Sequence, residues 1–337
     1  MLTAIWAILI FCVLIFIHEF GHFITAKMCK MTVHEFAIGM GPKLFSFGKK
    51  NTKYSLRALP LGGFVSLEGE DGDSNDPGAF CNNSAIKRFV VLFAGAFMNV
   101  LLGFLIFVVI FSTSNVVSNT TGDIVVDSPF DKAGIQKGDV IVYMDGETFS
   151  TSVHSYNDIS LFMNFNGGQT CEITFERNGK EFTKTITPEK SESGGYTLGF
   201  MITPMNRDFF SVISGAFWEC VFVIKSVFLS IWWLITGVVP ASDMSGPVGI
   251  VSEIGRQAQY GWRNVLNLAG FISVNLGVMN LLPIPALDGG RILFLLIEKI
   301  RGKKMKPETE GTINFVFFAI LIMLMLIITF SDIKKIL

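Results

Sequence analysis

His18-Glu19-Phe20-Gly21-His22 lies inside an apolar segment, residues 2–23. In a helix, residues four positions apart stand one turn apart on the same face. His18 and His22 can therefore bind one Zn²⁺ ion, while Glu19 reaches a water molecule beside it. Ionisable side chains in a membrane span are costly and by default face a bundle interior or a watery cavity. We expect a transmembrane helix that carries a metal site; the alternative is a chance match on a core helix.

The composition favours an integral membrane protein. Of the 337 residues, 50% are hydrophobic and 16% are charged, and the mean hydropathy is +0.51. This is too apolar for a typical water-soluble chain. The net charge of −1 gives no electrostatic basis for nucleic-acid binding. The five cysteines are scattered without CxxC spacing, so neither a disulfide framework nor a thiolate zinc site is expected.

The apolar stretches and the charges together predict four transmembrane helices. After the first, spanning length is reached at residues 89–111, 266–282 with a continuation to 297, and 313–330. Residues 212–239 either span or lie in the interface as an amphipathic helix. Lys and Arg cluster after the first span and before the last. If both clusters are cytoplasmic, an even number of crossings separates them, so 212–239 does not cross and both termini are extracytoplasmic.

Residues 113–207 are predicted to form one extracytoplasmic, β-rich domain. The region is polar, and alternating stretches that predict strands are separated by turn signals such as Asn178-Gly179. These stretches are residues 123–126, 140–144, 171–177 and 181–186. Residues 128–141 resemble the helix-to-strand signature of PDZ domains of the bacterial protease type. PDZ domains commonly bind peptides by adding a strand at a sheet edge, which suggests a substrate filter. A rigid cap that only blocks access is the alternative.

Residues 31–86 are too rich in apolar residues and glycine for a plain cytoplasmic loop. Residues 36–42 and 54–67 read as two strands of a membrane-associated hairpin. Open sheet edges are tolerated at membrane depth only against protein or beside a water-filled cavity. An unpaired edge beside the metal site could hold an extended peptide. A small cytoplasmic hairpin without substrate contact is the competing interpretation.

Two histidines leave zinc short of a ligand, because a catalytic site typically has three protein ligands and one open position. Asp288 lies deep in an apolar stretch that Pro283 and Pro285 should break. Counted from the flanking lysines at helical rise, Asp288 and the histidine pair reach a common depth. Asp288 is therefore the candidate third ligand, with a helix N-cap as the alternative. Asn280 either hydrogen-bonds a substrate backbone or joins helices, and Asn99 has the same ambiguity.

These features together resemble the site-2 protease family of intramembrane zinc metalloproteases, and within it the bacterial RseP-type regulators of sigma-factor signalling. The resemblance covers nearly the whole chain. One departure is that many relatives carry two tandem PDZ domains, whereas residues 113–207 have room for one. The motifs that carry it are the histidine motif at 18–22, Gly39-Met40-Gly41, Leu61-Gly62-Gly63-Phe64-Val65, the PDZ-like region, Ser245-Gly246-Pro247-Val248-Gly249, and residues 280–291 with Leu287-Asp288-Gly289.

The resemblance implies that His18, His22 and Asp288 bind Zn²⁺ and that Glu19 is the catalytic acid and base. It also implies that Asn280 and the edge strand, with Gly62, Gly63 and Phe64, position an unwound substrate helix. The expected activity is cleavage of transmembrane segments of single-span membrane proteins, such as an anti-sigma factor or remnant signal peptides. The expected location is the bacterial plasma membrane, with the lipid bilayer as a partner and no nucleic acid.

The expected fold class is a polytopic α-helical membrane protein with four transmembrane helices, a membrane-associated β-hairpin region and one extracytoplasmic PDZ-like domain. Two rival functions are a cation transporter with a midplane site and a catalytically silent scaffold. A transporter gives Glu19 no necessary role, and a scaffold needs no buried zinc ligands. The expected domains are the first helix at 1–30, the hairpin and loop at 31–86, the second helix at 87–112, the PDZ-like domain at 113–207, an interfacial helix and connector at 208–262, a broken third segment at 263–300, and a loop and fourth helix at 301–337.

Overall fold

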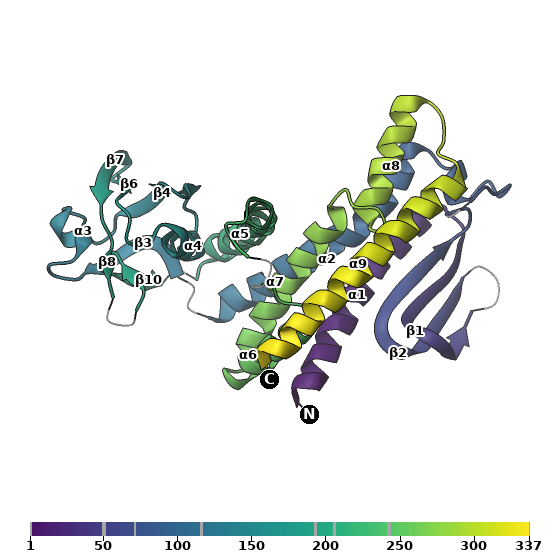
Figure 1. Cartoon of the computed structure of the whole chain (residues 1–337), viewed down its shortest axis with the longest axis horizontal. Coiled ribbons are helices and arrows are strands. Elements are labelled where there is room, and N and C mark those ends of the chain that lie inside the picture. The colour runs from purple at the N-terminus through teal and green to yellow at the C-terminus, as the bar shows by residue number, and fades with distance from the viewer. Residues whose placement is uncertain are drawn as a thin grey trace. The chain divides into compact units, whose positions relative to one another are not determined.

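The chain folds into two compact units, one made of residues 1–106 and 223–337 and the other of residues 107–222. The structure is a computed structural model (Figure 1), and its described residues are 2–48, 52–70, 72–114, 117–191, 194–204, 207–240 and 244–336. We describe the first as the helical unit and the second as the β-rich unit. Two helices, α2 and α5, run from one unit into the other.

Long helices make up most of the helical unit. Five helices in the described part of the chain are long and apolar enough to cross a membrane, one more than the four expected. The additional one is α5, the segment that the charge argument placed in the interface. The helices are α1 (Leu2–Met28), α2 (Ala85–Thr113), α5 (Phe209–Thr236), α6 (Pro247–Gln259), α7 (Trp262–Leu281), α8 (Asp288–Arg301) and α9 (Pro307–Ile336), with a short 3₁₀ turn at Phe80–Asn82.

The break expected in the third apolar segment is confirmed. Helix α7 ends at Leu281 and α8 begins at Asp288, so both prolines lie in the connection between them. Proline lacks an N–H donor and disfavours helical backbone at the residue before it, which explains why neither helix continues through this stretch. The connection brings Asp288 to the start of a new helix.

Strands β1 (Val33–Phe47) and β2 (Lys53–Leu67) form the predicted hairpin, and Figure 1 shows it lying beside α1. Each strand bends near its middle, where Gly39 and Gly62 have φ of +85° and +93°. The first half of β1 consequently pairs with both ends of β2. Among the described strands, the half-strand 63–67 is paired on one side only, so it is an edge.

Apolar side chains join this sheet to the helices. Val33 and Leu67, at the strand ends, pack in one buried cluster with Ala26, Val91 and other apolar residues of α1 and α2. A close approach of α1 to α2 is required at Gly21, where a Cβ would lie 2.5 Å from the Ala94 carbonyl oxygen. The edge half-strand is thereby held against the helix that carries the histidines.

Residues 245–249, one of the motifs without an assigned role in the sequence, form the start of α6. The backbone amides of Gly246 and Gly249 each donate to Oδ2 of Asp332 at 2.8 Å. Asp332 lies in the last turns of α9 and is buried. The motif therefore joins the N-terminus of α6 to α9 through a carboxylate, which satisfies amides that a helix start leaves unpaired.

The β-rich unit contains an antiparallel sheet in the order β10-β3-β4-β6-β7, with β5 paired to β4. The predicted strands at 140–144, 171–177 and 181–186 are confirmed as β4, β6 and β7, and 123–126 overlaps only the end of β3. Asn178 and Gly179, both at positive φ, turn β6 into β7. The elements are β3 (Val117–Ile124), α3 (Pro129–Lys132), β4 (Val140–Asp145), β5 (Thr151–Ser152), α4 (Tyr156–Asn166), β6 (Cys171–Arg177), β7 (Lys180–Ile186), β8 (Glu189–Lys190), β9 (Tyr196–Thr197) and β10 (Phe200–Pro204).

A buried carboxylate ties the start of β4 to the end of β6. Asp139 Oδ1 accepts from Arg177 Nε at 2.6 Å, and its Oδ2 accepts from Arg177 Nη2 at 2.6 Å and from the Gln136 amide at 2.8 Å. Burial alone would raise the pKa of Asp139, but these hydrogen bonds and the Arg177 charge lower it overall. The ionised carboxylate is thus fully matched by donors.

Candidate metal centre

The two histidines of α1 face the same point. Their Nε2 atoms are 3.2 Å apart, as the four-residue spacing predicts for one helix face. Nδ1 of His22 lies 2.8 Å from the Val91 carbonyl oxygen on α2 and donates to it. This hydrogen bond fixes the tautomer of His22, because a neutral imidazole that is protonated on Nδ1 keeps its lone pair on Nε2.

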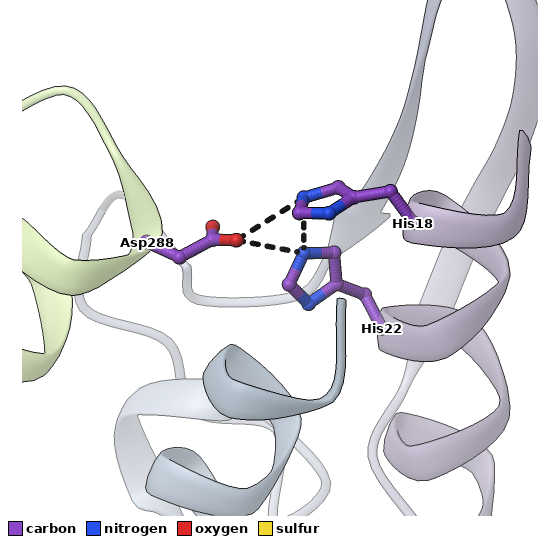
Figure 2. A group of neighbouring side chains, drawn as sticks. All are labelled: His18, His22 and Asp288. Carbon is purple, nitrogen blue, oxygen red and sulfur yellow. Dashed lines mark hydrogen bonds and ion pairs between the residues drawn. The ribbon is translucent and has the colours of Figure 1, made fainter. Parts of the chain in front are cut away.

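Asp288 completes the cluster from α8 (Figure 2). Its Oδ2 lies 3.1 Å from Nε2 of His18 and 3.3 Å from Nε2 of His22. The helix N-cap is Leu287, and Asp288 occupies the first helical position with its side chain directed at the histidines. The N-cap interpretation of Asp288 is therefore not what the structure shows, and convergence of all three residues is confirmed.

The three donor atoms have the spacing that a Zn²⁺ site requires. Nitrogen and oxygen ligands of tetrahedral zinc lie about 2.0–2.2 Å from the ion, which places them about 3.3 Å from one another. The separations here are 3.1–3.3 Å. Asp288 Oδ2 is buried, yet no hydrogen bond of acceptable geometry reaches it within the described structure. Three ligand atoms that converge at this spacing fit a cation.

Asn99 lies behind His18, on α2. It is fully buried, and its Nδ2 is 3.3 Å from Nδ1 of His18, while its backbone carbonyl accepts from Ser273 Oγ at 2.7 Å. The alternative amide orientation, rotated by 180°, presents Oδ1 to Nδ1–H of His18 and leaves Nε2 free for a metal. The location favours the helix-joining interpretation of Asn99. It also gives Asn99 a second role, which is to support the ring of His18.

Gly95 on α2 leaves room for the two imidazoles. A Cβ at this position would lie 2.3 Å from Nε2 of His22 and 2.9 Å from Cε1 of His18, distances that atoms do not tolerate. This glycine was not among the site residues predicted from the sequence. Its role depends on the distance between two helices, which no periodicity along either helix encodes.

A cavity of about 380 Å³ opens at the cluster. It is lined by the three metal-ligand candidates, Glu19, the edge half-strand from Phe64 to Leu67, and a few neighbours. Glu19 adjoins the sheet, because a Cβ on Gly63 would meet its Cγ at 3.2 Å. This volume exceeds that of one water molecule about tenfold, so the site has room for water and for part of a chain.

The structure separates the other substrate-binding candidates. Phe64 lines the cavity, Gly63 lies directly beside Glu19, and Gly62 lies at the bend of β2. Asn280 is half-buried in the last turn of α7 and is not among the described residues that line the cavity. The geometry therefore does not place Asn280 at the cavity beside the metal cluster.

An ion pair that sequence reasoning missed also lines the cavity. Arg291, one turn after Asp288 on α8, contacts Glu70, which follows β2. The pair connects α8, which carries Asp288, to the segment that follows the edge half-strand. The three-residue spacing from Asp288 to Arg291 was the available signal, because it places both on one helix face.

A helix-borne HExxH motif whose histidines meet a carboxylate, among helices of membrane-spanning length, is typical of a membrane zinc metallopeptidase. The sequence profile of peptidase family M50 matches residues 6–324. The chain belongs to peptidase family M50, the site-2 protease family, and it is a zinc metalloprotease of that type with Zn²⁺ as its cofactor.

Proteins of similar sequence are named as proteases. The chain is 42% identical over 331 residues to a protein of Clostridium acetobutylicum named as a zinc metalloprotease, covering 97% of this chain and 96% of the relative. It is 30% identical over 419 residues to the regulator of sigma-W protease RasP of Bacillus subtilis, covering 99% of this chain and 98% of the relative. These relatives confirm the predicted family and disfavour the transporter and scaffold alternatives.

A solved PDZ domain of an SdrC-like protein from Listeria monocytogenes shares 19% identity with part of this chain. The match covers 27% of this chain and 90% of that domain, with a TM-score of 0.21. A likeness of this size carries no argument about the fold, so the PDZ-like interpretation stays a prediction from residues 128–141.

Proposed function

We propose that this protein cleaves transmembrane segments of single-span membrane proteins at the cluster of His18, His22 and Asp288. The observation that carries the proposal is the meeting of these ligands with Glu19 and an open strand edge in one cavity. His18, His22 and Asp288 would hold the Zn²⁺ ion, which would polarise the scissile carbonyl as a Lewis acid and lower the pKa of a bound water toward about 7. Side chains of the protein carry out the remaining steps.

Glu19 moves the proton in this proposal. Its carboxylate lines the same cavity as the ligands, one residue after His18. It accepts a proton from the attacking water and delivers that proton to the nitrogen of the leaving amine. The three ligand candidates keep their positions throughout. The Val91 carbonyl holds His22, the Asn99 amide holds His18, and the first turn of α8 holds Asp288.

The edge half-strand at residues 63–67 supports binding of an extended substrate. A helical substrate hides its peptide bonds in backbone hydrogen bonds, so it must open locally before cleavage. An unpaired strand edge can take up the donors and acceptors that opening exposes. Gly62, Gly63 and Phe64 are the proposed contacts, and we keep Asn280 as a further candidate at the end of α7.

The test replaces Glu19 with glutamine in the full-length protein. Glu19→Gln preserves shape and metal ligands, so we expect one bound zinc ion and a loss of about 10²–10⁴-fold in cleavage of a reporter membrane span. Glu253→Gln, on the surface of α6 where Glu253 pairs with Arg256, is the matched control and should cleave at the wild-type rate. Wild-type turnover by Glu19→Gln would refute the assignment.

The natural substrates are proposed by class. One relative is named a regulator of sigma-W protease, which supports an anti-sigma factor as one substrate, with remnant signal peptides as another. The β-rich unit is proposed as a PDZ-like filter that admits spans whose outer domain has been removed. A peptide-binding measurement on the full-length protein distinguishes the two alternatives, because a PDZ-like filter binds peptide and a rigid cap does not.

We propose four crossings in the bacterial plasma membrane, with both termini extracytoplasmic. Within the β-rich unit, the His154 ring stacks on Trp218 of α5 at 3.6 Å, and Asn157 Nδ2 contacts both Glu219 carboxylate oxygens at 2.9 and 3.0 Å. A polar domain stays outside hydrocarbon. The rest of α5, residues 223–236, is about 21 Å long, shorter than a bilayer core of about 30 Å. Maleimide labelling of single cysteines near residues 239 and 302 from either side tests this topology.

A further inference from the structure

The connection that carries Asp288 contains an unusual backbone conformation. Ala286 has φ of +75°, a region that residues with a Cβ adopt rarely. Such a conformation is energetically costly and persists only where its surroundings enforce it. Because Ala286 lies two positions before Asp288, relaxation of this conformation would move the third metal ligand.

A side chain of α9 holds this position. Oδ1 of Asn314 accepts from the backbone amide of Ala286 at 3.0 Å. The neighbouring bonds stay within the connection and the start of α8, such as Ile284 N to the Leu282 carbonyl at 2.7 Å and Leu287 N to the Ile284 carbonyl at 3.2 Å. The bond from Ala286 therefore ties the strained residue to a different helix.

The place of Asn314 in α9 is informative. The apolar window of α9 has no buried residue in the described structure, and its side chains near Asn314, such as Phe315 and Phe318, are exposed. A polar amide in such a helix is costly unless it is hydrogen-bonded. At the other end of α9, Asp332 binds the amides of Gly246 and Gly249. This helix thus contributes polar side chains that hold the backbone of other elements.

We propose that Asn314 is a positioning residue of the metal centre. By holding the Ala286 amide, it keeps the connection in its strained form and keeps Oδ2 of Asp288 on the two histidines. The inference rests on the proposed function only for the identity of the three ligands. Asn314 acts through the backbone, and it is not among the described residues that line the cavity at the metal cluster.

The test measures how fast zinc leaves the purified full-length protein. Asn314→Leu removes the acceptor at similar volume, and we expect zinc release to a colorimetric chelator to accelerate at least tenfold. Asn314→Asp keeps an oxygen acceptor and should release zinc near the wild-type rate. Thr312→Val is the matched control, because the Thr312 hydroxyl donates to the Glu308 carbonyl within α9 at 2.7 Å, and it should leave the rate unchanged.

A second substitution separates backbone strain from general packing of α9. Glycine adopts φ of +75° without steric cost, so Ala286→Gly in the Asn314→Leu background should restore much of the zinc retention. Faster release that Ala286→Gly does not slow would assign the effect to packing and overturn the proposal. Wild-type release by Asn314→Leu would also overturn it. Retention of zinc by His18→Ala would instead refute the ligand set of the proposed function.

Discussion

Asp139 and Asp288 both have buried carboxylate oxygens, but the surroundings of the two carboxylates differ. Asp139, in the β-rich unit, accepts three hydrogen bonds from an arginine and a backbone amide. Asp288, in the helical unit, presents a buried oxygen to two imidazole nitrogens with no hydrogen bond to it in the described chain. A carboxylate whose donors are complete stabilises the fold, whereas one left unmatched among ligand atoms is available to bind an ion.

Substituting each aspartate in turn tests this difference most strongly. Asp288→Ala should lose bound zinc and proteolysis together while the protein remains folded. Asp139→Ala should retain one zinc ion but lower the free energy of unfolding by about 1–3 kcal/mol, because Arg177 loses its partner. Zinc analysis and thermal unfolding of both variants give the comparison. Zinc retained in Asp288→Ala would contradict the distinction.

The second prediction concerns the space around the unmatched oxygen. Gly95→Ala places a methyl group within 2.3 Å of His22 Nε2, so the imidazole must turn away from Asp288. We expect zinc affinity to fall at least tenfold, as measured by competition with a chelator. The control is Gly72→Ala, since a Cβ there meets no atom within 4 Å. Equal affinity in both variants would show that α2 does not shape the site.

The third prediction concerns the support of His18. Asn99→Leu removes the amide beside Nδ1 of the ring, and loss of such a partner typically lowers metal affinity about 10–100-fold. Asn99→Asp, which keeps an oxygen acceptor, should bind zinc more tightly than the leucine variant. The measurement is again chelator competition. A leucine variant with wild-type affinity would show that the Asn99 side chain does not support His18.

The smallest expected effect concerns pH and the matched carboxylate. The pKa of Asp139 in the folded state is below its ordinary value of 3.8. Its contribution to stability is therefore present above about pH 4 and is lost as the pH falls through the folded-state pKa. Hydrogen exchange of β4 and β6, corrected for intrinsic rates between pH 3 and 5, should show this loss in the wild type. Asp139→Asn should remove that part of the dependence.

The sequence predicted the features that depend on local period and spacing. The histidine pair, the broken third segment and the two strands of the hairpin all follow from residue types at fixed intervals. Asp288 was found because its depth could be counted from flanking lysines. The fold class was right in its helices and sheets, while the helix count depends on where α5 lies, which hydropathy does not encode.

The remaining features depend on contacts between distant segments. Gly95 has a role only because α2 approaches α1 closely. The strained Ala286 and its partner Asn314 become visible only when α9 meets the connection before α8. The bends at Gly39 and Gly62 divide the hairpin into four half-strands and require positive φ at these glycines. The sequence around them indicates only a turn. Asn280 illustrates the converse, because its motif placed it at the site and the cavity lining does not include it.

The outer part of the hairpin leaves Leu44, Phe45 and Phe47 more than 60% exposed. Burial of such exposed apolar side chains in acyl chains would be favourable. We predict that this part of the hairpin lies in lipid, so that the depth of the bilayer affects the position of the strand beside Glu19. Reaction rates in reconstituted vesicles should then vary with acyl-chain length.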